Sequence, residues 1–247
     1  DVFEEVGCNV WYDAAHVLGL IGAGKFQQPT ENGVDVMTGS THKTLPGPQR
    51  GIILSNPKDE QMEESLFYGM FPGVVSNHHL HTMAALGVAL AEHQKFGEEY
   101  ADQIIKNAQA LGQSLNERGI EVLCEHKGFT RSHTLAIDVQ DQGGGETLVE
   151  AMEDANMIAN KNLMPWDDVD SANEPSGIRL GSQALTRLGM KESHMDEVAE
   201  FIKRIIVDDD DPDKVKQDVI EFRKDFQKVK FCFHDDFKAH KHYSILD

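Results

Sequence analysis

Three short apolar runs near the start of the chain predict buried β-strands. The first, around VGCNVWYD, ends at Asp13, the second, GVDVMTGSTHK, ends near Lys43, and the third, RGIILSN, follows a Pro-Gly-Pro turn. Apolar runs punctuated by glycine and proline are typical of strands buried in the sheet of an α/β protein. Ligands of such proteins bind at the carboxyl ends of strands, so Asp13 and Lys43 occupy positions where a ligand is expected.

The pattern changes to a helical period at about His79. From there to Gly119 apolar residues recur at three- and four-residue spacing, with an interruption near Gly97. This spacing predicts two long helices separated at that glycine.

The remainder of the chain alternates strand and helix patterns. Strands are expected at IEVLC, HTLAIDV and SGIRLG, and helices at ETLVEAMEDAN and ESHMDEVAEFIKRIIVD. An acidic run at residues 208–211, followed by Pro212, predicts the cap and first turn of a final helix. We interpret this part as a second, smaller α+β domain.

Composition and charge narrow the range of partners. The chain has 247 residues, of which 40% are hydrophobic, and a formal net charge of −19. This charge repels nucleic-acid backbones and anionic lipids, so neither nucleic acid nor a membrane is expected as a partner. No apolar run approaches the roughly 20 residues that a membrane-spanning helix needs.

The cysteines and histidines offer little support for a metal protein. Cys8, Cys124 and Cys232 lack C-x-x-C spacing, which argues against a disulfide framework or a zinc ribbon and favours a reducing cytoplasm. The histidines have no H-E-x-x-H spacing, so no metal site is predicted, although a metal-binding protein remains an alternative. The histidines that would serve it are His78, His79, His81, His234, His240 and His242.

Asp13 and Lys43 are the residue types that pyridoxal phosphate requires. A lysine holds this cofactor as a Schiff base, and a carboxylate faces its ring nitrogen so that the ring acts as an electron sink. Taken singly, the two residues are better explained as a helix-capping aspartate and a solvated turn lysine, so their residue types alone do not establish a cofactor site.

Several longer phrases resemble one family. YDAAHVLGLIGAGKF followed by VMTGSTHKTLPGPQRGIIL closely resembles the serine hydroxymethyltransferases, which are fold type I pyridoxal-phosphate enzymes. FPG, HTMAALGVAL, NKN and SGIRLGSQALTRLGM follow in the order that the family has them. The likeness covers nearly the whole chain.

The resemblance implies an α/β fold with two parts. Residues 1–96 would be the C-terminal part of the cofactor-binding large domain, with a mostly parallel sheet, and residues 97–247 the small α+β domain. The family's N-terminal part has no counterpart in this sequence, so we expect the chain to be a fragment that is inactive alone. The resemblance also implies a homodimer or homotetramer.

The resemblance assigns roles around the cofactor. Lys43 would form the Schiff base, with His42 helping to place it. Asp13 would pair with the pyridinium nitrogen, and His16 would lie near the phenolic oxygen of the cofactor.

Three further residues complete the implied site. Ser40 and Thr41 would also contact the cofactor, and Arg179 would bind the carboxylate of the amino-acid substrate, since its guanidinium can bind both oxygens.

The implied reaction is the interconversion of serine and glycine with transfer of a one-carbon unit to tetrahydrofolate. Trp166 stands where the family often has an asparagine near the folate pteridine, and Ser76 and Asn77 replace glycines after the FPG phrase. A folate-independent aldolase acting on β-hydroxy amino acids is therefore the alternative. A non-catalytic homologue that serves only in subunit association is another.

Overall fold

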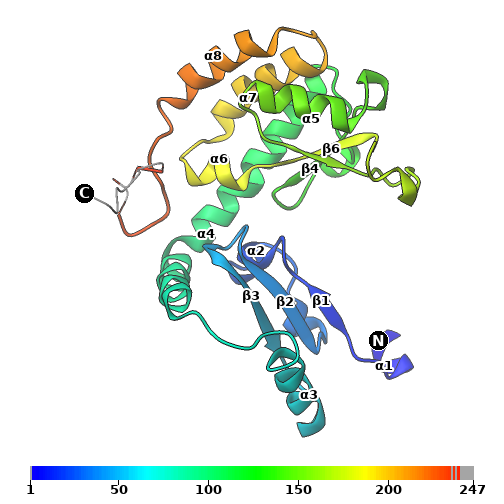
Figure 1. The fold of residues 1–247 in the computed structure, drawn as a ribbon, viewed down its shortest axis with the longest axis vertical. Coiled ribbons are helices and arrows are strands. Elements are labelled where there is room, and N and C mark those ends of the chain that lie inside the picture. The colour runs from blue at the N-terminus through cyan, green and yellow to red at the C-terminus, as the bar shows by residue number, and fades with distance from the viewer. Residues whose placement is uncertain (1, 235, 237, 240–247) are drawn as a thin grey trace. The chain divides into compact units, whose positions relative to one another are not determined.

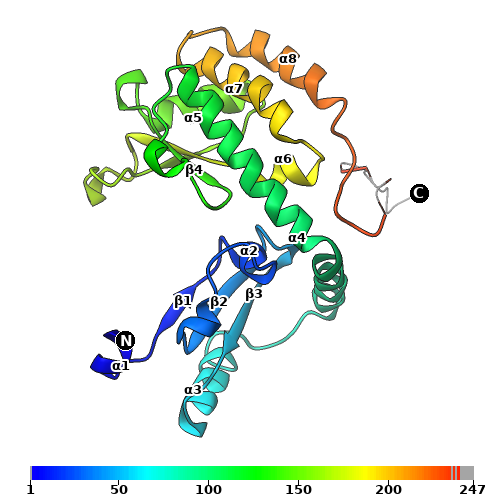
Figure 2. The ribbon, with the colours of Figure 1, turned by 180° about the vertical axis from the view of Figure 1, so that it is seen from behind.

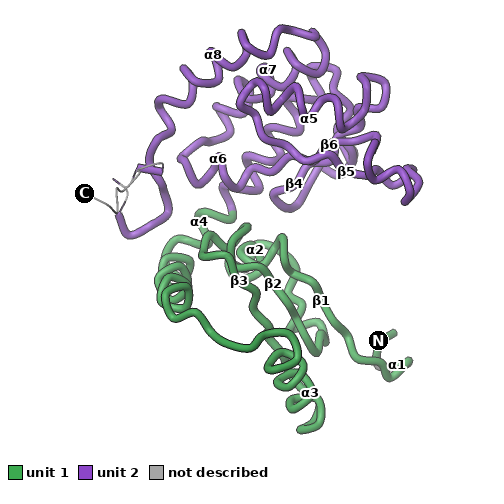
Figure 3. The backbone as a smooth tube through the Cα atoms, in the orientation of Figure 1, with its two compact units in different colours: residues 1–101 green, residues 102–247 purple. Residues whose placement is uncertain are grey.

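The chain forms two compact units. A computed structural model describes residues 2–234, 236, 238 and 239. Residues 1–101 make up unit 1 and residues 102–247 make up unit 2 (Figure 3). The functional assignment of residues 1–96 and 97–247 to two domains stays a prediction.

Unit 1 is built on a three-stranded mixed sheet in the order β1-β2-β3 (Figure 1). The first pair of strands is parallel and the second is antiparallel. The strands are β1 (Trp11–Asp13), β2 (Val36–His42) and β3 (Pro46–Ser55). The helices are α1 (Val2–Val6), α2 (Leu18–Gly22), a 3-10 turn (Pro29–Asn32) and α3 (Glu60–Met70).

Alternation along β2 explains how the sheet of unit 1 is covered. Met37, Gly39 and Thr41 are buried, whereas the residues between them are half-buried. Helix α2 lies over the buried face (Figure 2), because Leu18 packs with Met37 in a small apolar core and approaches Gly39. This arrangement follows from the period of two in a strand.

The third strand differs from the prediction in two ways. It begins at Pro46, so the Pro-Gly-Pro sequence lies inside β3 and the turn is formed by residues 43–45. The expectation of a buried strand is wrong for β3, which has no buried residue, and also for β1, where Tyr12 is half-buried and Trp11 and Asp13 are exposed. Within the described chain β3 pairs with β2 alone, and prolines are tolerated on such an edge strand.

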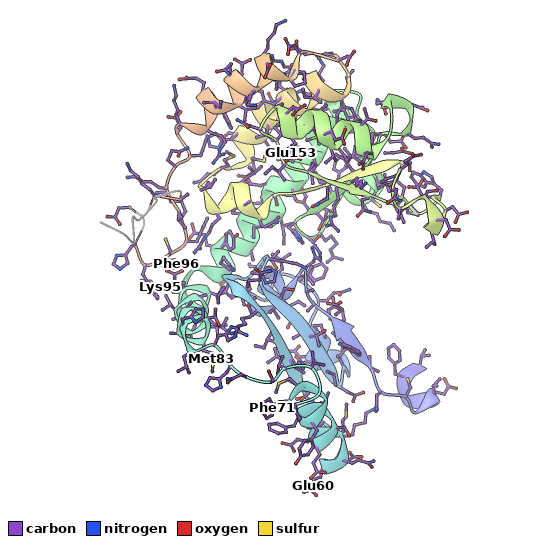
Figure 4. The ribbon with its side chains drawn as sticks, in the orientation of Figure 1. Glu60, Phe71, Met83, Lys95, Phe96 and Glu153 are labelled. Carbon is purple, nitrogen blue, oxygen red and sulfur yellow. The ribbon has the colours of Figure 1, made fainter. Side chains whose placement is uncertain are left out.

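A single helix, α4 (Leu80–Glu117), replaces the two helices that were predicted, and it contributes residues to both units. Gly97 does not interrupt it. A Cβ atom at Gly97 would lie 2.8 Å from the ring of His93, one turn earlier. The glycine therefore makes room for a side chain and leaves the helix intact. Figure 4 labels Lys95 and Phe96 in this stretch of α4, where the Lys95 Nζ atom lies 5.1 Å from the centre of the Phe96 ring.

Unit 2 packs helices around a second sheet, which is antiparallel and has the order β4-β6-β5. The strands are β4 (Thr134–Asp138), β5 (Asn160–Asn162) and β6 (Gly177–Gly181). The helices are α5 (Gly145–Asp154), α6 (Gln183–Arg187), α7 (Glu192–Ile206) and α8 (Pro212–Arg223). Three short 3-10 turns are Glu125–Lys127, Gln140–Gln142 and Val169–Ser171.

Most of the predicted elements of unit 2 are present. Pro212 opens α8 and the Asp211 carboxylate accepts a hydrogen bond from the Asp213 N–H at 3.1 Å, as the capping pattern predicts. The expected strand at IEVLC is wrong, because that segment forms a single bridge between Val122 and Ile137. Its alternating apolar residues are nevertheless used, since Val122 is buried in the core of unit 2.

The described residues give no sign of a membrane span or a metal centre. No described helix is long and apolar enough to cross a bilayer. No group of three or more His, Cys, Asp or Glu side chains is placed to hold a metal within residues 2–234, 236, 238 and 239. His79 and His81 stack at 5.8 Å, while His240 and His242 lie outside the described residues.

Candidate active site

Asp13 and Lys43 lie at the carboxyl end of strands β1 and β2 in unit 1. We call this end of the sheet the Lys43 edge. Asp13 is the last residue of β1, and Lys43 follows the last residue of β2. These strands are parallel, with Asp13 paired to Thr38, so both strands end on the same side of the sheet. The sequence-based expectation that the two residues share a sheet edge is confirmed.

Thr44 joins the segments that follow the two strands. Its hydroxyl donates to the carbonyl of His16 at 2.8 Å and accepts from the N–H of Gly19 at 3.1 Å. The side chain is only 1% exposed. Sequence reasoning missed this residue, for which the only signal was a hydroxyl side chain directly after the lysine. Thr44 therefore locks the lysine turn to the loop after Asp13.

Two glycines allow this close contact. A Cβ atom at Gly19 would lie 2.3 Å from the carbonyl oxygen of Thr44, and one at Gly39 would lie 2.8 Å from the Leu18 side chain. Any larger residue at either position would push α2 away from β2 or from the turn. The glycine-rich phrase after Asp13 thus serves packing at this edge.

The hairpin that carries Lys43 is also closed from its other side. The buried Thr41 hydroxyl lies 2.6 Å from the carbonyl oxygen of Pro48, and the Gly47 N–H donates to the Leu45 carbonyl at 3.0 Å. The Thr41 hydroxyl, a predicted cofactor contact, is thus engaged within the hairpin. These bonds fix the backbone on both sides of Lys43.

The functional groups at this edge are open to a ligand. Lys43 and Ser40 are half-buried and His42 is exposed. None of these three side chains has a hydrogen bond or ion pair to another residue in the described part of the chain.

The Asp13 side chain is oriented by a hydrogen bond from the backbone of the loop that follows it. One oxygen of exposed Asp13 accepts the N–H of Ala15 at 2.9 Å. His16 is half-buried in the same loop.

The opposite end of the sheet is structural. Buried Asp35 accepts the Val10 N–H at 2.7 Å and pairs with Lys58 at 3.0 Å. The backbone hydrogen bond from Val10, followed by the bond from Lys58, holds the pKa of Asp35 below its usual range. This ion pair ties the start of β2 to the segments before β1 and after β3.

A groove of about 500 Å³ opens between the sheet of unit 1 and α3. Its lining is almost wholly apolar and includes Trp11, Ile53 and Met70. Trp11 is 72% exposed, and its indole N–H donates to the Thr38 hydroxyl at 3.0 Å. The groove lacks the convergent polar groups found beside Lys43, so we do not assign chemistry to it.

Arg179 lies on the central strand of the sheet in unit 2. It pairs with Ala136 of β4 and Asn160 of β5. Its neighbours Ile178 and Leu180 are buried in the core, so the half-buried Arg179 side chain lies on the opposite face. No carboxylate among the described residues pairs with it. An anion could therefore bind there without displacing an existing partner.

Trp166 belongs to a loop of unit 2 that is held in place by hydrogen bonds to the carboxylate of Asp167. The Asp167 carboxylate accepts the N–H groups of Met164 at 2.8 Å and Ser176 at 3.0 Å. Met164 is buried against Gly177, where a Cβ atom would lie 2.1 Å from its methyl group. Trp166 itself remains 53% exposed.

Comparison with known proteins gives a consistent result. The family model described as serine hydroxymethyltransferase matches residues 1–202. The chain is 53% identical over 236 residues to the serine hydroxymethyltransferase of Methanocella arvoryzae, covering 96% of this chain and 55% of the relative. It is 50% identical over 247 residues to that of Methanopyrus kandleri, covering 100% of this chain and 57% of the relative.

A solved structure supports the same fold. The L-threonine transaldolase from Pseudomonas fluorescens, solved in its internal aldimine state, matches with a TM-score of 0.84 and 32% identity. The match covers 94% of this chain and 52% of that one, and it confirms the predicted α/β fold class. The chain spans about half the length of the curated relatives it matches. With the family match over residues 1–202 and half of all aligned residues identical in these relatives, the chain belongs to the serine hydroxymethyltransferase family.

Proposed function

We propose that this chain contributes to a pyridoxal-phosphate enzyme that interconverts serine and glycine and transfers the one-carbon unit to tetrahydrofolate. The observation that carries the proposal is the position of Lys43 at the same end of the sheet as Asp13, in a turn whose backbone Thr44 ties to the loop after Asp13. The alternative of a folate-independent aldolase is not favoured, because identity to the curated serine hydroxymethyltransferases reaches 53%, against 32% for the transaldolase.

The residues at this edge fit the cofactor chemically. A primary amine, a carboxylate and two imidazoles match the aldehyde, ring nitrogen and phenolic oxygen of pyridoxal phosphate. When bound, the cofactor supplies an electron sink for the carbon next to the substrate amine. Lys43, Asp13, His16 and His42 would hold it.

Each residue would have a distinct task. Lys43 provides the nucleophilic amine, and the closed hairpin limits the positions that this amine can take. Asp13 would hold a proton on the ring nitrogen with the carboxylate oxygen that Ala15 does not engage. Ser40 is the better placed of the two predicted hydroxyl contacts, since the Thr41 hydroxyl is already bonded to the Pro48 carbonyl.

Unit 2 would bind the substrate carboxylate. Arg179 has a planar guanidinium that can donate to both oxygens of a carboxylate, and no described acid occupies it. The tethered loop that exposes Trp166 is the candidate contact for tetrahydrofolate.

We also propose that the protein assembles as a homodimer or homotetramer in the cytoplasm. Exposed apolar side chains on α3 and in the segment after it support an interface, since such patches are usually covered by a partner. Figure 4 labels Glu60 at the start of α3 and Phe71 directly after its end, and it also labels Met83, an exposed residue of α4. The free cysteines Cys8 and Cys124 support a reducing compartment.

Covalent trapping tests the assignment of Lys43. The active protein that carries these residues is loaded with pyridoxal phosphate, reduced with borohydride and digested. Mass spectrometry should then locate the cofactor on the peptide that contains Lys43. A Lys43→Ala variant should lose the label, whereas Lys25→Ala should keep it, because the Lys25 amine is paired with Glu98. Labelling that persists in Lys43→Ala would refute the assignment.

Acceptor dependence tests the reaction. Release of glycine from serine should rise steeply when tetrahydrofolate is added. Equal turnover of a β-hydroxy amino acid with and without tetrahydrofolate would establish the aldolase instead.

A further inference from the structure

The end of strand β6 is fastened to helix α4. Ser182 follows the last residue of β6 and is 1% exposed. Its hydroxyl donates to the carbonyl of Ile104 in α4 at 2.8 Å, and its backbone N–H donates to the carbonyl of His133 at 3.0 Å. Both bonds lie within unit 2. One residue thus joins β6 to the helix behind it and to the chain that enters β4.

The use that Ser182 makes of its hydroxyl is unusual for its position. It occupies the N-cap of α6, where a serine ordinarily accepts a hydrogen bond from its own helix. No such bond forms here. The hydroxyl is therefore committed to the contact between β6 and α4.

Asn107 extends the contact. This fully buried residue of α4 donates from its amide nitrogen to the Thr186 hydroxyl and to the Met190 carbonyl, both at 2.9 Å. Its amide oxygen accepts from the side chain of Gln103 at 2.9 Å. The Thr186 hydroxyl in turn donates to the carbonyl of Ser182 at 2.8 Å. We call the hydrogen bonds of Asn107, Ser182 and Thr186 the α4–β6 network.

The α4–β6 network adds to the apolar packing of Ile178 and Leu180, which sets the register of β6, by fixing the end of that strand against α4. Buried hydrogen bonds add little net stability, but a fully bonded buried network fixes one arrangement of the elements that it joins. Arg179 lies three residues before Ser182 on β6. A shift of the end of β6 relative to α4 would therefore displace the Arg179 side chain even if the strand kept its register.

We propose that the α4–β6 network positions Arg179 for the substrate carboxylate, which makes Ser182 and Asn107 positioning residues. The inference rests on the proposed function, in which Arg179 binds that carboxylate. Neither residue is predicted to touch substrate or cofactor. Their effect should therefore appear in substrate binding more than in the chemical step.

The test compares two serine-to-alanine changes on buried hydroxyls of unit 2. Ser182→Ala removes the bond to α4, and Ser182→Thr keeps a hydroxyl. Ser114→Ala is the matched control, since Ser114 is a buried α4 residue whose hydroxyl bonds to Asp196 of α7 at 2.8 Å, away from β6. Serine KM and kcat are measured for the holoenzyme, together with the unfolding midpoint and hydrogen exchange of the β6 amides.

We expect Ser182→Ala to raise KM by about tenfold, with kcat within about twofold, because small displacements of a binding group are costly. Exchange of the β6 amides should become faster in Ser182→Ala, and Ser182→Thr should restore KM. Ser114→Ala should lower the unfolding midpoint without changing KM. Equal KM values in Ser182→Ala and Ser114→Ala would overturn the inference.

A reference variant separates this inference from the proposed function. If Arg179→Ala leaves KM unchanged, then the assignment of Arg179 to the substrate carboxylate fails. If Arg179→Ala raises KM while Ser182→Ala does not, then only the positioning role fails.

Discussion

The two units hold their candidate functional residues by different means. In unit 1 the buried apolar cluster beneath the Lys43 edge consists of Ala14, Leu18, Ile21, Met37 and Leu45. In unit 2 an extensive core includes residues from α4, α5, α7, α8 and the strands β4 and β6. Unit 1 also leaves large apolar side chains exposed on α3, which has no buried residue at all.

This difference shows what keeps each group in place. The Lys43 turn depends on a few short polar and backbone contacts, above all those of Thr44 with His16 and Gly19. Arg179 depends on a packed sheet and on Ser182, the residue after β6, which is hydrogen-bonded to helix α4. We therefore expect a single substitution of a supporting residue to displace the functional side chain more in unit 1 than in unit 2.

The largest effect is expected at the carboxylate of unit 1. Asp13→Asn should lower kcat by about 100-fold or more, because a neutral amide does not hold a proton on the ring nitrogen. Asp138→Asn is a matched control in unit 2. Asp138 also ends a strand, and its carboxylate accepts the N–H two residues on at 3.0 Å, as Asp13 does at 2.9 Å. Steady-state kinetics that show equal losses in both variants would contradict a special role for Asp13.

The next effect is expected at the arginine of unit 2. Arg179→Ala should raise the KM for serine by about 30-fold or more, which corresponds to about 2 kcal/mol of lost binding to a carboxylate. Arg179→Lys should recover part of this loss, since it keeps the charge but not the paired donors. If kcat falls and KM does not change, then Arg179 acts in the chemical step and the contrast between the units must be redrawn.

A packing change in unit 1 should have a moderate effect on stability. Gly19→Ala should lower the free energy of unfolding by about 1–3 kcal/mol, because its Cβ would clash with the Thr44 backbone. Gly87→Ala, at an open position in α4, should instead be neutral or stabilising by up to about 1 kcal/mol. Denaturant unfolding of the two variants measures the difference. Similar stabilities would show that α2 can shift without cost.

The smallest effect is expected on the stability of the protein at acid pH. Hydrogen bonds from Val10 and Lys58 hold the pKa of Asp35 below its usual range, so its stabilising contribution is present near neutral pH and is lost as pH falls through the lowered pKa, below about pH 4. Asp35→Asn should flatten the decline of the unfolding midpoint in that range.

Asp196 in unit 2 provides the comparison for the acid experiment. Its pKa is also lowered, first by the Ser114 hydroxyl and then by Arg118, but its side chain is 73% exposed. Asp196→Asn should therefore change the acid profile less than Asp35→Asn, because water screens an exposed pair. A larger change in Asp196→Asn would place the acid-sensitive contact in unit 2.

Much of this arrangement could be predicted from the sequence where local patterns decide it. Apolar runs located the strands that end at Asp13 and near Lys43, and the capping pattern located Pro212 at the start of α8. Gly97 misled the prediction because a helical glycine can serve a neighbouring side chain as well as break a helix. The bonds of Thr44 and Ser182 could not be predicted, since they join residues distant in the sequence.

Each unit carries one of the two tryptophans of the chain, Trp11 in unit 1 and Trp166 in unit 2. Trp11→Phe would leave emission from unit 2 alone, and Trp166→Phe would leave emission from unit 1 alone. The two units can therefore be followed separately by fluorescence during unfolding. Trp11 lies two residues before Asp13, so quenching of its emission by a bound chromophore would give a continuous optical signal for occupancy of that sheet edge.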